Sequence, residues 1–245
     1  MPGIRLGGYR TAADAAAAGW VAAGLRGFGG SVLSVVPAGF EAYARVFHPA
    51  GRRDGDARVP VSWRQVADAN GRVAHPAMQW CSLVGSCSLA GGSRPQPGVW
   101  DEEPAMGSLP RDLAVVLAGV LAGWTATPER GWFAVWDGFA DLAVPRDAPS
   151  FEIPGRRLLL LTGPVGAAGG NLAAAPSWQS PNLWWPDDRS WCVGTDVDLM
   201  STYVGGSRAC VRAILDHPRF EAAAAQAGHG VTYAGDQLNP SAHQR

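Results

Sequence analysis

The chain has 245 residues, 47% of them hydrophobic and 17% charged, which allows a substantial core in one large domain or two small ones. Its net charge of −1 gives no long-range field that would gather nucleic acid or an anionic membrane surface. Because all 20 cationic side chains are arginine, Schiff-base chemistry and lysine-type phosphate binding are excluded.

Tryptophan is the compositional outlier, with 11 residues against 7 Phe and 4 Tyr. Indole rings bring a large apolar area and one hydrogen-bond donor. Their density favours a core built with tryptophan, and a ring-lined binding surface is the alternative.

The four cysteines, Cys81, Cys87, Cys192 and Cys210, form no Cys-x-x-Cys pair. The N-terminal segment is interrupted by charges, so it lacks the apolar region of a signal peptide, and no run reaches transmembrane length. We therefore expect a cytoplasmic protein with free thiols. We expect no cofactor and no metal centre, because Cys81, Cys87 and His75 lack the spacing of ordinary zinc sites.

Capping patterns, turn formers and apolar periodicity predict the elements of the first half of the chain. In order, these are a short helix over 12–18, a β-hairpin with strands 31–36 and 40–48, an exposed loop over 49–60, a helix from Ser62 to Gly71, a strand or short helix over 75–83, and a surface loop over 90–106 anchored by Trp100.

The second half begins with the most regular helical pattern, in which six apolar residues from Leu113 to Trp124 form one stripe. Residues 157–162 are apolar on both faces, which is typical of a central, covered strand. The predicted elements are a helix over 108–124, a strand over 132–137, a strand over 157–162, a flexible segment over 163–177, one long strand over 191–200, a helix from Ser207 and a short Ala-rich helix after Pro218.

The strand predicted over 40–48 places Glu41 and Arg45 on one face, on either side of Tyr43. A carboxylate and a guanidinium so arranged could line a binding site. The alternative is a solvated strand face, which this pattern favours.

The stretch from Ser180 to Ser207 has the densest run of specific residues, with Trp184 and Trp185 followed by Asp187, Asp188 and Arg189. Arg189 could bind a carboxylate or phosphate of a ligand that lies against one of the indoles. Equally, a local Asp–Arg pair could fix the turn while the rings pack beneath it. Two adjacent tryptophans on a turn rarely reach the same core, so we expect one of them to meet solvent or a ligand.

Asp196 and Asp198 project from the same face of the long predicted strand, with Cα atoms about 6.5–7 Å apart. This spacing suits a shared divalent cation or an acid–base pair, with His48 or His75 as the best candidate general base. No third metal ligand follows from local spacing, which favours two solvated carboxylates. No Gly-x-Ser-x-Gly, His-Glu-x-x-His or dinucleotide-binding motif is present in the sequence.

The segments GFEAYARVFHPA, HPAMQW, TPERGWFAVWDG and SPNLWWPDDRSWCVGTDVDLMSTYVGGS resemble a group of uncharacterised actinobacterial proteins of similar length. The likeness covers most of the chain, and the last segment is its most specific motif. No activity is established for that group, so the resemblance implies no catalytic residue. The strand–loop–helix ending resembles the SUKH group of bacterial immunity and regulatory proteins, which would imply an exposed acidic patch that meets a toxin.

Taken together, the sequence predicts one α+β domain over 1–245, with a mixed or mainly antiparallel sheet, a few packed helices, a flexible N-terminus of about ten residues and a loose tail from about 228. The leading hypothesis is a non-enzymatic binding protein with a polar, Trp-lined groove for an unknown small molecule or protein partner. A hydrolase-like or metal-assisted enzyme using Asp196, Asp198 and a histidine is the alternative, and an immunity-type protein is the third.

Overall fold

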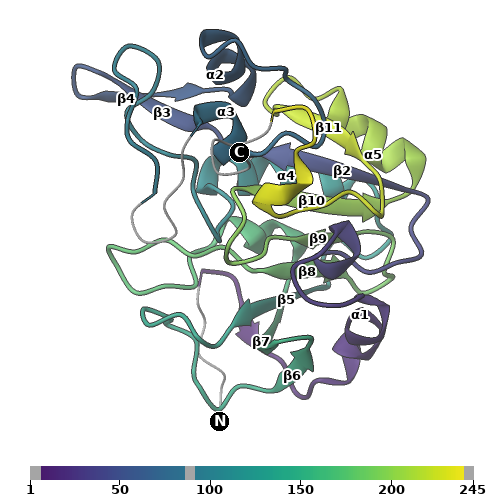
Figure 1. Cartoon of the computed structure of the whole chain (residues 1–245). Coiled ribbons are helices and arrows are strands. Elements are labelled where there is room, and N and C mark those ends of the chain that lie inside the picture. Colours follow the sequence, from purple (N-terminus) through teal and green to yellow (C-terminus); the bar gives the residue numbers. More distant parts are fainter. Residues whose placement is uncertain (1–6, 86–91, 240–245) are drawn as a thin grey trace.

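The structure, a computed structural model, describes residues 7–85 and 92–239, and these residues form a single α+β domain (Figure 1). Nine strands make one antiparallel sheet in the order β1-β7-β5-β8-β9-β10-β2-β11, with β6 added to β7, and β3 and β4 form a separate hairpin. The predicted fold class is therefore confirmed. The strands are β1 (Arg10–Thr11), β2 (Ala42–Phe47), β3 (Ala50–Asp54), β4 (Ala57–Val61), β5 (Gly131–Trp136), β6 (Ser150–Ile153), β7 (Arg156–Gly163), β8 (Leu183–Pro186), β9 (Cys192–Gly194), β10 (Ser201–Gly206) and β11 (Ala222–Ala225).

Helices cover both faces of the large sheet. On one face α4, α5 and the 3-10 turn η3 pack against alternate strand residues, such as Phe133 and Val204. On the other face, α1 and the segment around η2 pack against the intervening residues, such as Ala134 and Tyr203. The helical elements are η1 (Ala16–Ala18), α1 (Gly19–Gly24), η2 (Val32–Ser34), α2 (Trp63–Ala69), α3 (Trp80–Val84), α4 (Arg111–Ala122), η3 (Val165–Gly169), α5 (Arg208–Leu215) and η4 (Tyr233–Gly235).

A separate small core lies where the β3–β4 hairpin, α2 and α3 meet one end of the sheet. Its centre is a chain of rings in which Trp63 contacts Phe47 at 5.0 Å and Trp80 at 5.5 Å, and Trp80 contacts Trp100 at 5.1 Å between ring centroids. Most of the tryptophan in this part of the chain is therefore core material, as the composition favours.

Several predicted elements are confirmed, and each has a local cause. Ser62 and Gln65 form a reciprocal capping box at the start of α2. Ser207 accepts a hydrogen bond from the Cys210 N–H and so caps α5. Strand β7 is covered on both faces, as its apolar run predicts, although it is second in the strand order rather than central. Trp124, the last residue of the stripe predicted for α4, lies beyond the helix and is exposed.

Three predictions for the N-terminal half are wrong. Gly19 does not stop a helix over 12–18, because its helical backbone starts α1. Residues 31–36 contain the 3-10 turn η2 rather than a strand, and Val32, Val35 and Val36 are buried against the sheet. Residues 49–60 are not a loop but contain the β3–β4 hairpin, which turns at Gly55, where φ is +59°. Gly51 of this hairpin pairs with the backbone of Glu102.

Three predictions for the C-terminal half are also wrong. The segment 163–177 includes η3, whose Gly169 lies so close to the Val115 side chain that an added Cβ would overlap it; here glycine serves close packing rather than flexibility. The Ala-rich run after Pro218 is strand β11 rather than a helix, because pairing with β2 overrides its helix propensity.

The long strand predicted over 191–200 is the third error, because it is interrupted after β9. Residues 195–200 form a turn in which the Leu199 N–H bonds to the Asp196 carbonyl and the Asp198 N–H to the Asp196 side chain. An aspartate that accepts from the backbone two residues on is a common turn former.

The chain is ordered further toward its ends than we predicted. Tyr9 is fully buried, and Asp236 and Asn239 are buried within the segment that was expected to be loose from about 228. Residues 1–6 and 240–245 lie outside the described residues, as does Cys87. Within the described chain, no helix has both the length and the apolar character needed to cross a membrane.

Candidate functional site

The expectation that Trp184 or Trp185 meets solvent or a ligand is wrong. The two residues are only 2% and 1% exposed, because they lie in strand β8 and point to opposite faces of a sheet that is covered on both sides. Trp184 contacts Trp191 at 5.2 Å, and Trp185 contacts Trp20 at 6.0 Å between ring centroids. Neither indole therefore lines a groove.

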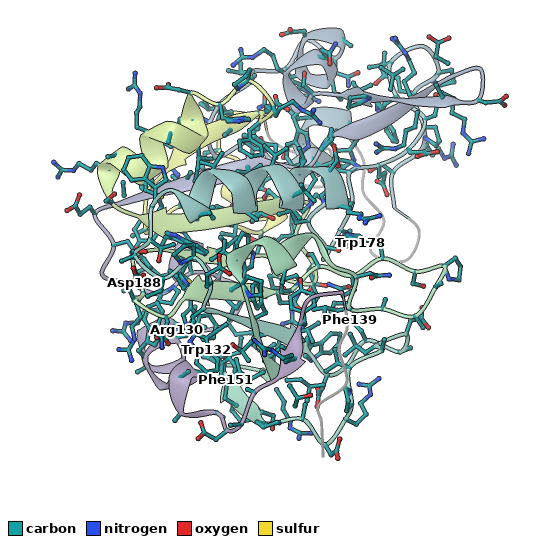
Figure 2. The ribbon with its side chains drawn as sticks, turned by 180° about the vertical axis from the view of Figure 1, so that it is seen from behind. Arg130, Trp132, Phe139, Phe151, Trp178 and Asp188 are labelled. Atoms are coloured by element: carbon teal, nitrogen blue, oxygen red, sulfur yellow. The ribbon has the colours of Figure 1, made fainter. Side chains whose placement is uncertain are left out.

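The turn that follows β8 is held by two aspartates that bond to residues 125–132, between the end of α4 and the start of β5, rather than to Arg189. Asp187 accepts a hydrogen bond from the Trp132 indole N–H at 3.0 Å and pairs with Arg130 at 2.9 Å. In Figure 2, Arg130, Trp132 and Asp188 lie together on one flank of the molecule. The local Asp–Arg pair that we considered for Arg189 is thus absent from this turn.

Asp188 fixes the same turn through three hydrogen bonds, from the Thr125 hydroxyl, the Ala126 N–H and the Ser190 N–H, at 2.7–3.0 Å. Burial raises its pKa, but hydrogen bonds from backbone and side-chain groups together outweigh burial and hold the pKa below its usual value. Asp188 is therefore ionised at neutral pH, and its hydrogen bonds hold the turn that carries Arg189.

The same turn presents Arg189 to solvent. Its backbone has a φ of +57°, and its guanidinium lies over the Trp20 ring, 5.7 Å from the ring centroid. Among the described residues it has no carboxylate partner within ion-pair distance, and its side chain is exposed. A guanidinium with free donors beside an aromatic ring is well suited to bind an anion.

Arg189 and Trp20 border an open groove with a volume of about 390 Å³. Phe40 forms a second aromatic wall, with its ring centroid 6.2 Å from that of Trp20 in an edge-to-face arrangement. Gly205 makes room for this ring, because a Cβ at that position would lie 2.4 Å from Phe40. The groove is lined by Trp20, Ala38, Gly39, Phe40, Glu41, Arg189, Ser190, Gly206 and Ser207.

Glu41 brings a negative charge to the groove that holds Arg189. One of its carboxylate oxygens accepts the Arg208 N–H at 3.1 Å, at the start of α5, and its side chain remains exposed. Glu41 and Arg189, both chosen from the sequence, therefore meet in one groove, although Trp184 and Trp185 do not. Sequence reasoning missed Trp20 and Phe40; a single tryptophan in an Ala/Gly-rich segment was the signal available for Trp20.

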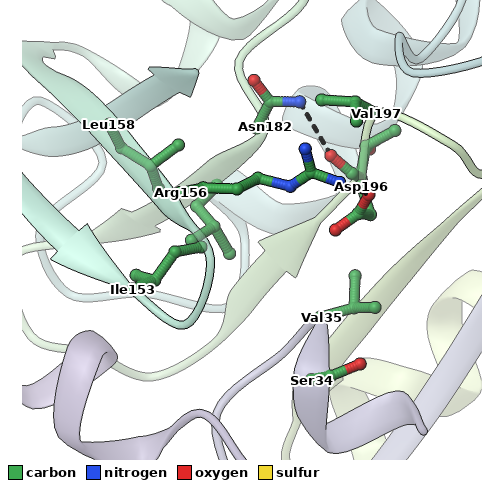
Figure 3. A pocket seen from close by; sticks show the side chains of 10 residues that line it. Ser34, Val35, Ile153, Arg156, Leu158, Asn182, Asp196 and Val197 are labelled. Carbon is green, nitrogen blue, oxygen red and sulfur yellow. Dashed lines mark hydrogen bonds and ion pairs between the residues drawn. The ribbon is translucent and has the colours of Figure 1, made fainter. Parts of the chain in front are cut away.

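Asp196 and Asp198 converge on a cation of the protein itself. The Arg156 guanidinium donates to Asp196 at 2.7 Å and to Asp198 at 3.2 Å, so the expectation of two merely solvated carboxylates is wrong for Asp196, whereas Asp198 is 78% exposed. Figure 3 shows Arg156 reaching past Ile153 and Leu158 toward Asp196. The adjoining cavity of about 20 Å³ has room for about one water molecule.

The two candidate histidines do not join the aspartate pair. His48 is fully buried between the Ala105 carbonyl, 2.6 Å from Nδ1, and the Thr202 hydroxyl, 2.9 Å from Nε2. A carbonyl only accepts, so Nδ1 carries the proton and Nε2 accepts from Thr202. Burial lowers the pKa of His48 to about 4, which keeps the ring neutral at physiological pH.

His75 bonds to another carboxylate, the buried Asp236, at 2.9 Å between Nε2 and Oδ1. Asp236 also accepts the backbone N–H groups of Gln79 and Asn239 at 3.1 and 2.8 Å. This cluster attaches the C-terminal segment to the region before α3. The hydrogen bond to Asp236 explains the position of His75 in the fold, and none of the hydrogen bonds of this cluster reaches Asp196.

Arg45 is buried, so neither a ligand contact nor a solvated strand face describes it. Its guanidinium donates to the Met78 carbonyl at 2.7 Å and to the Ser201 hydroxyl at 2.9 Å, and it lies over the Phe47 ring at 4.6 Å. Burial lowers the pKa of Arg45 from its ordinary value. Arg45 therefore serves to join β2 to the segment before α3.

Two further observations bear on metal and thiol chemistry. Within residues 7–85 and 92–239, no group of three or more His, Cys, Asp and Glu side chains is arranged to hold a metal ion. Cys81 is disulfide-bonded, so the prediction of free thiols is wrong for this residue, while Cys192 and Cys210 are free and buried. Pairing depends on proximity in space, which the spacing of cysteines in the sequence does not reveal.

Comparison of the chain with protein-family models, with curated proteins and with solved structures finds no match. The resemblances noted from the sequence motifs therefore remain predictions.

Proposed function

We propose that the protein is a non-enzymatic binding protein whose ligand occupies the groove between Trp20, Phe40, Glu41 and Arg189. The observation that carries this proposal is the exposed Arg189 guanidinium, which lies over the Trp20 ring at the border of a groove of about 390 Å³ without a carboxylate partner among the described residues. Pockets of a few hundred Å³ that combine aromatic walls with a few polar groups are typical of small-molecule sites.

The chemistry of the other candidate residues supports binding rather than catalysis. Asp196 and Asp198 share Arg156, His48 is buried and neutral, and His75 bonds to Asp236. An acid–base or metal-assisted mechanism needs these groups to converge on one accessible pocket, and their partners are different. No observation on the described residues favours the immunity-type alternative.

The cytoplasmic location stays a prediction, and the disulfide at Cys81 counts against it. Disulfides persist in oxidising compartments and are uncommon in the cytosol. The proposed groove does not depend on this location.

A thermal-shift screen of small metabolites tests the proposal with three proteins: wild type, Arg189→Gln and Arg52→Gln. Arg52 in β3 is the matched control, because it is exposed and lies outside the groove. A ligand at about 100 times its Kd stabilises the folded protein by about 2.7 kcal/mol, or roughly 5–10 °C for a domain of this size.

We expect a stabilising ligand to act on wild type and Arg52→Gln and to lose its effect on Arg189→Gln. The proposal fails if the ligands found by the screen stabilise all three proteins equally, because Arg189 would then play no part in binding.

A further inference from the structure

We infer that the groove selects a zwitterionic ligand, an α-amino acid with a flat apolar side chain, whose carboxylate binds Arg189 and whose ammonium group binds Glu41. This inference rests on the proposed function and assigns a ligand class to the same groove. It follows from the two charges, the two rings and the size of the groove, taken in turn.

The groove contains one unpaired cation and one exposed anion. Arg189 has no carboxylate partner among the described residues, and Glu41 uses one oxygen for the Arg208 N–H, which leaves the other without a hydrogen bond in the described structure. A ligand with only a negative group would be attracted by Arg189 and repelled by Glu41, and the reverse holds for a ligand with only a positive group. A ligand that carries both groups satisfies both residues.

The same charges disfavour nucleotides and phosphorylated sugars. Their phosphates carry two or more negative charges, whereas the groove has no net charge from its Glu41 and Arg189 side chains. The cation that a phosphate would need in addition to Arg189 is missing from the residues that line the groove.

The rings define the apolar part of the ligand. Trp20 and Phe40 meet edge to face, and the small residues Ala38, Gly39 and Gly206 lie beside them and leave space. Aromatic rings prefer edge-to-face and offset contacts with a further ring. The volume of about 390 Å³ is at the lower end of the range for small-molecule pockets and fits one amino acid rather than a folded partner.

The test measures the affinity of L-phenylalanine and three partial analogues by isothermal titration calorimetry. 3-Phenylpropionate lacks the ammonium group, 2-phenylethylamine lacks the carboxylate, and L-alanine lacks the ring. We expect wild type to bind L-phenylalanine at least tenfold more tightly than each analogue.

Two variants assign the charges. Arg189→Gln should remove the advantage of L-phenylalanine over 2-phenylethylamine, and Glu41→Gln should remove its advantage over 3-phenylpropionate, since the glutamine oxygen can still accept the Arg208 N–H. Glu152→Gln, a change at an exposed glutamate of β6 outside the groove, should leave all four affinities unchanged.

The outcomes separate the inference from the proposed function. If 3-phenylpropionate binds wild type as tightly as L-phenylalanine and both lose affinity in Arg189→Gln, the groove binds anions and the zwitterion inference is overturned while the proposed function stands. If none of the four compounds binds but another compound stabilises wild type through Arg189, the inference is again overturned alone. Binding that is indifferent to both Arg189 and Glu41 overturns both.

Discussion

At the scale of single residues, the environment of each charged or polar group decided its role more than its identity did. Arg45 and Arg189 are both arginines next to aromatic rings, yet Arg45 is buried with hydrogen bonds to carbonyl and hydroxyl groups while Arg189 is exposed. His48 and His75 differ in their partners, since His48 is enclosed between neutral groups and His75 bonds to a carboxylate. Of the two arginines, only Arg189, which is exposed and has no carboxylate partner among the described residues, is available to a ligand.

The buried His48 predicts how stability depends on pH. Its pKa is about 4 in the folded protein against an ordinary value of 6.5, so between these values the unfolded chain binds more protons than the folded one. Stability is therefore complete above pH 6.5 and falls as the pH is lowered toward 4. We expect this residue to reduce the free energy of unfolding by about 2 kcal/mol between pH 8 and pH 5.

Urea unfolding of wild type and His48→Gln at several pH values measures this effect. The glutamine does not titrate, so the loss of stability toward pH 5 should be smaller in the variant by about the same amount. Equal pH dependence in the two proteins would show that His48 does not hold a depressed pKa.

At the scale of elements, the connection between β9 and β10 is held by the pairing of Asp196 and Asp198 with Arg156. The two ion pairs differ in exposure. Asp196 is mostly buried and lies 2.7 Å from Arg156, whereas Asp198 is exposed and lies 3.2 Å from it. Surface ion pairs contribute little to stability, and removing a partner from a buried one costs more.

We therefore expect Asp196→Asn to lower the free energy of unfolding by about 1–3 kcal/mol, and Asp198→Asn to change it by less than about 0.5 kcal/mol. Chemical denaturation of the two variants measures the difference. Comparable losses would contradict the unequal roles of the two pairs. Stabilisation by Mg²⁺ or Mn²⁺ of wild type but not of Asp196→Asn would show that the carboxylates accept a metal in place of Arg156.

At the scale of the whole molecule, the covered faces of the sheet and the separate core around α2 and α3 together explain why most tryptophan is buried. Three separate cores take up the apolar side chains, one on each face of the sheet and one around α2 and α3. With both faces occupied, two adjacent residues of a strand can both be buried, as Trp184 and Trp185 are.

The reactivity of the cysteines tests two features of the structure, the burial of Cys192 and Cys210 and the disulfide of Cys81. The disulfide also bears on the cellular compartment of the protein. Cys192 and Cys210 lie in the core, where burial raises the pKa of each thiol. We expect both to resist alkylation in the native protein and to react in denaturant without a reductant, because only burial protects them. Cys81 should react only after reduction. Peptide mapping by mass spectrometry after differential alkylation measures this, and reaction of Cys81 without a reductant would contradict the disulfide.

The sequence by itself determined the fold class, the covered strand β7, helix α4, and the caps of α2 and α5. These features depend on local rules, namely apolar periodicity and the hydrogen bonds of a side chain to a backbone only a few residues away. It also identified Glu41 and Arg189 as candidate ligand-binding residues, which the fold places in one groove.

Only the tertiary structure decided which rings accompany these charges. Trp20 and Phe40 reach the groove because α1 packs on the sheet and Gly205 of β10 leaves room for Phe40. These contacts join segments about 165 to 190 residues apart. The strand pairing of β11 and the ion pairs of Asp196 and Asp198 were likewise set by distant partners, β2 and Arg156. Such contacts depend on how the chain closes long loops around its core, which no local pattern encodes.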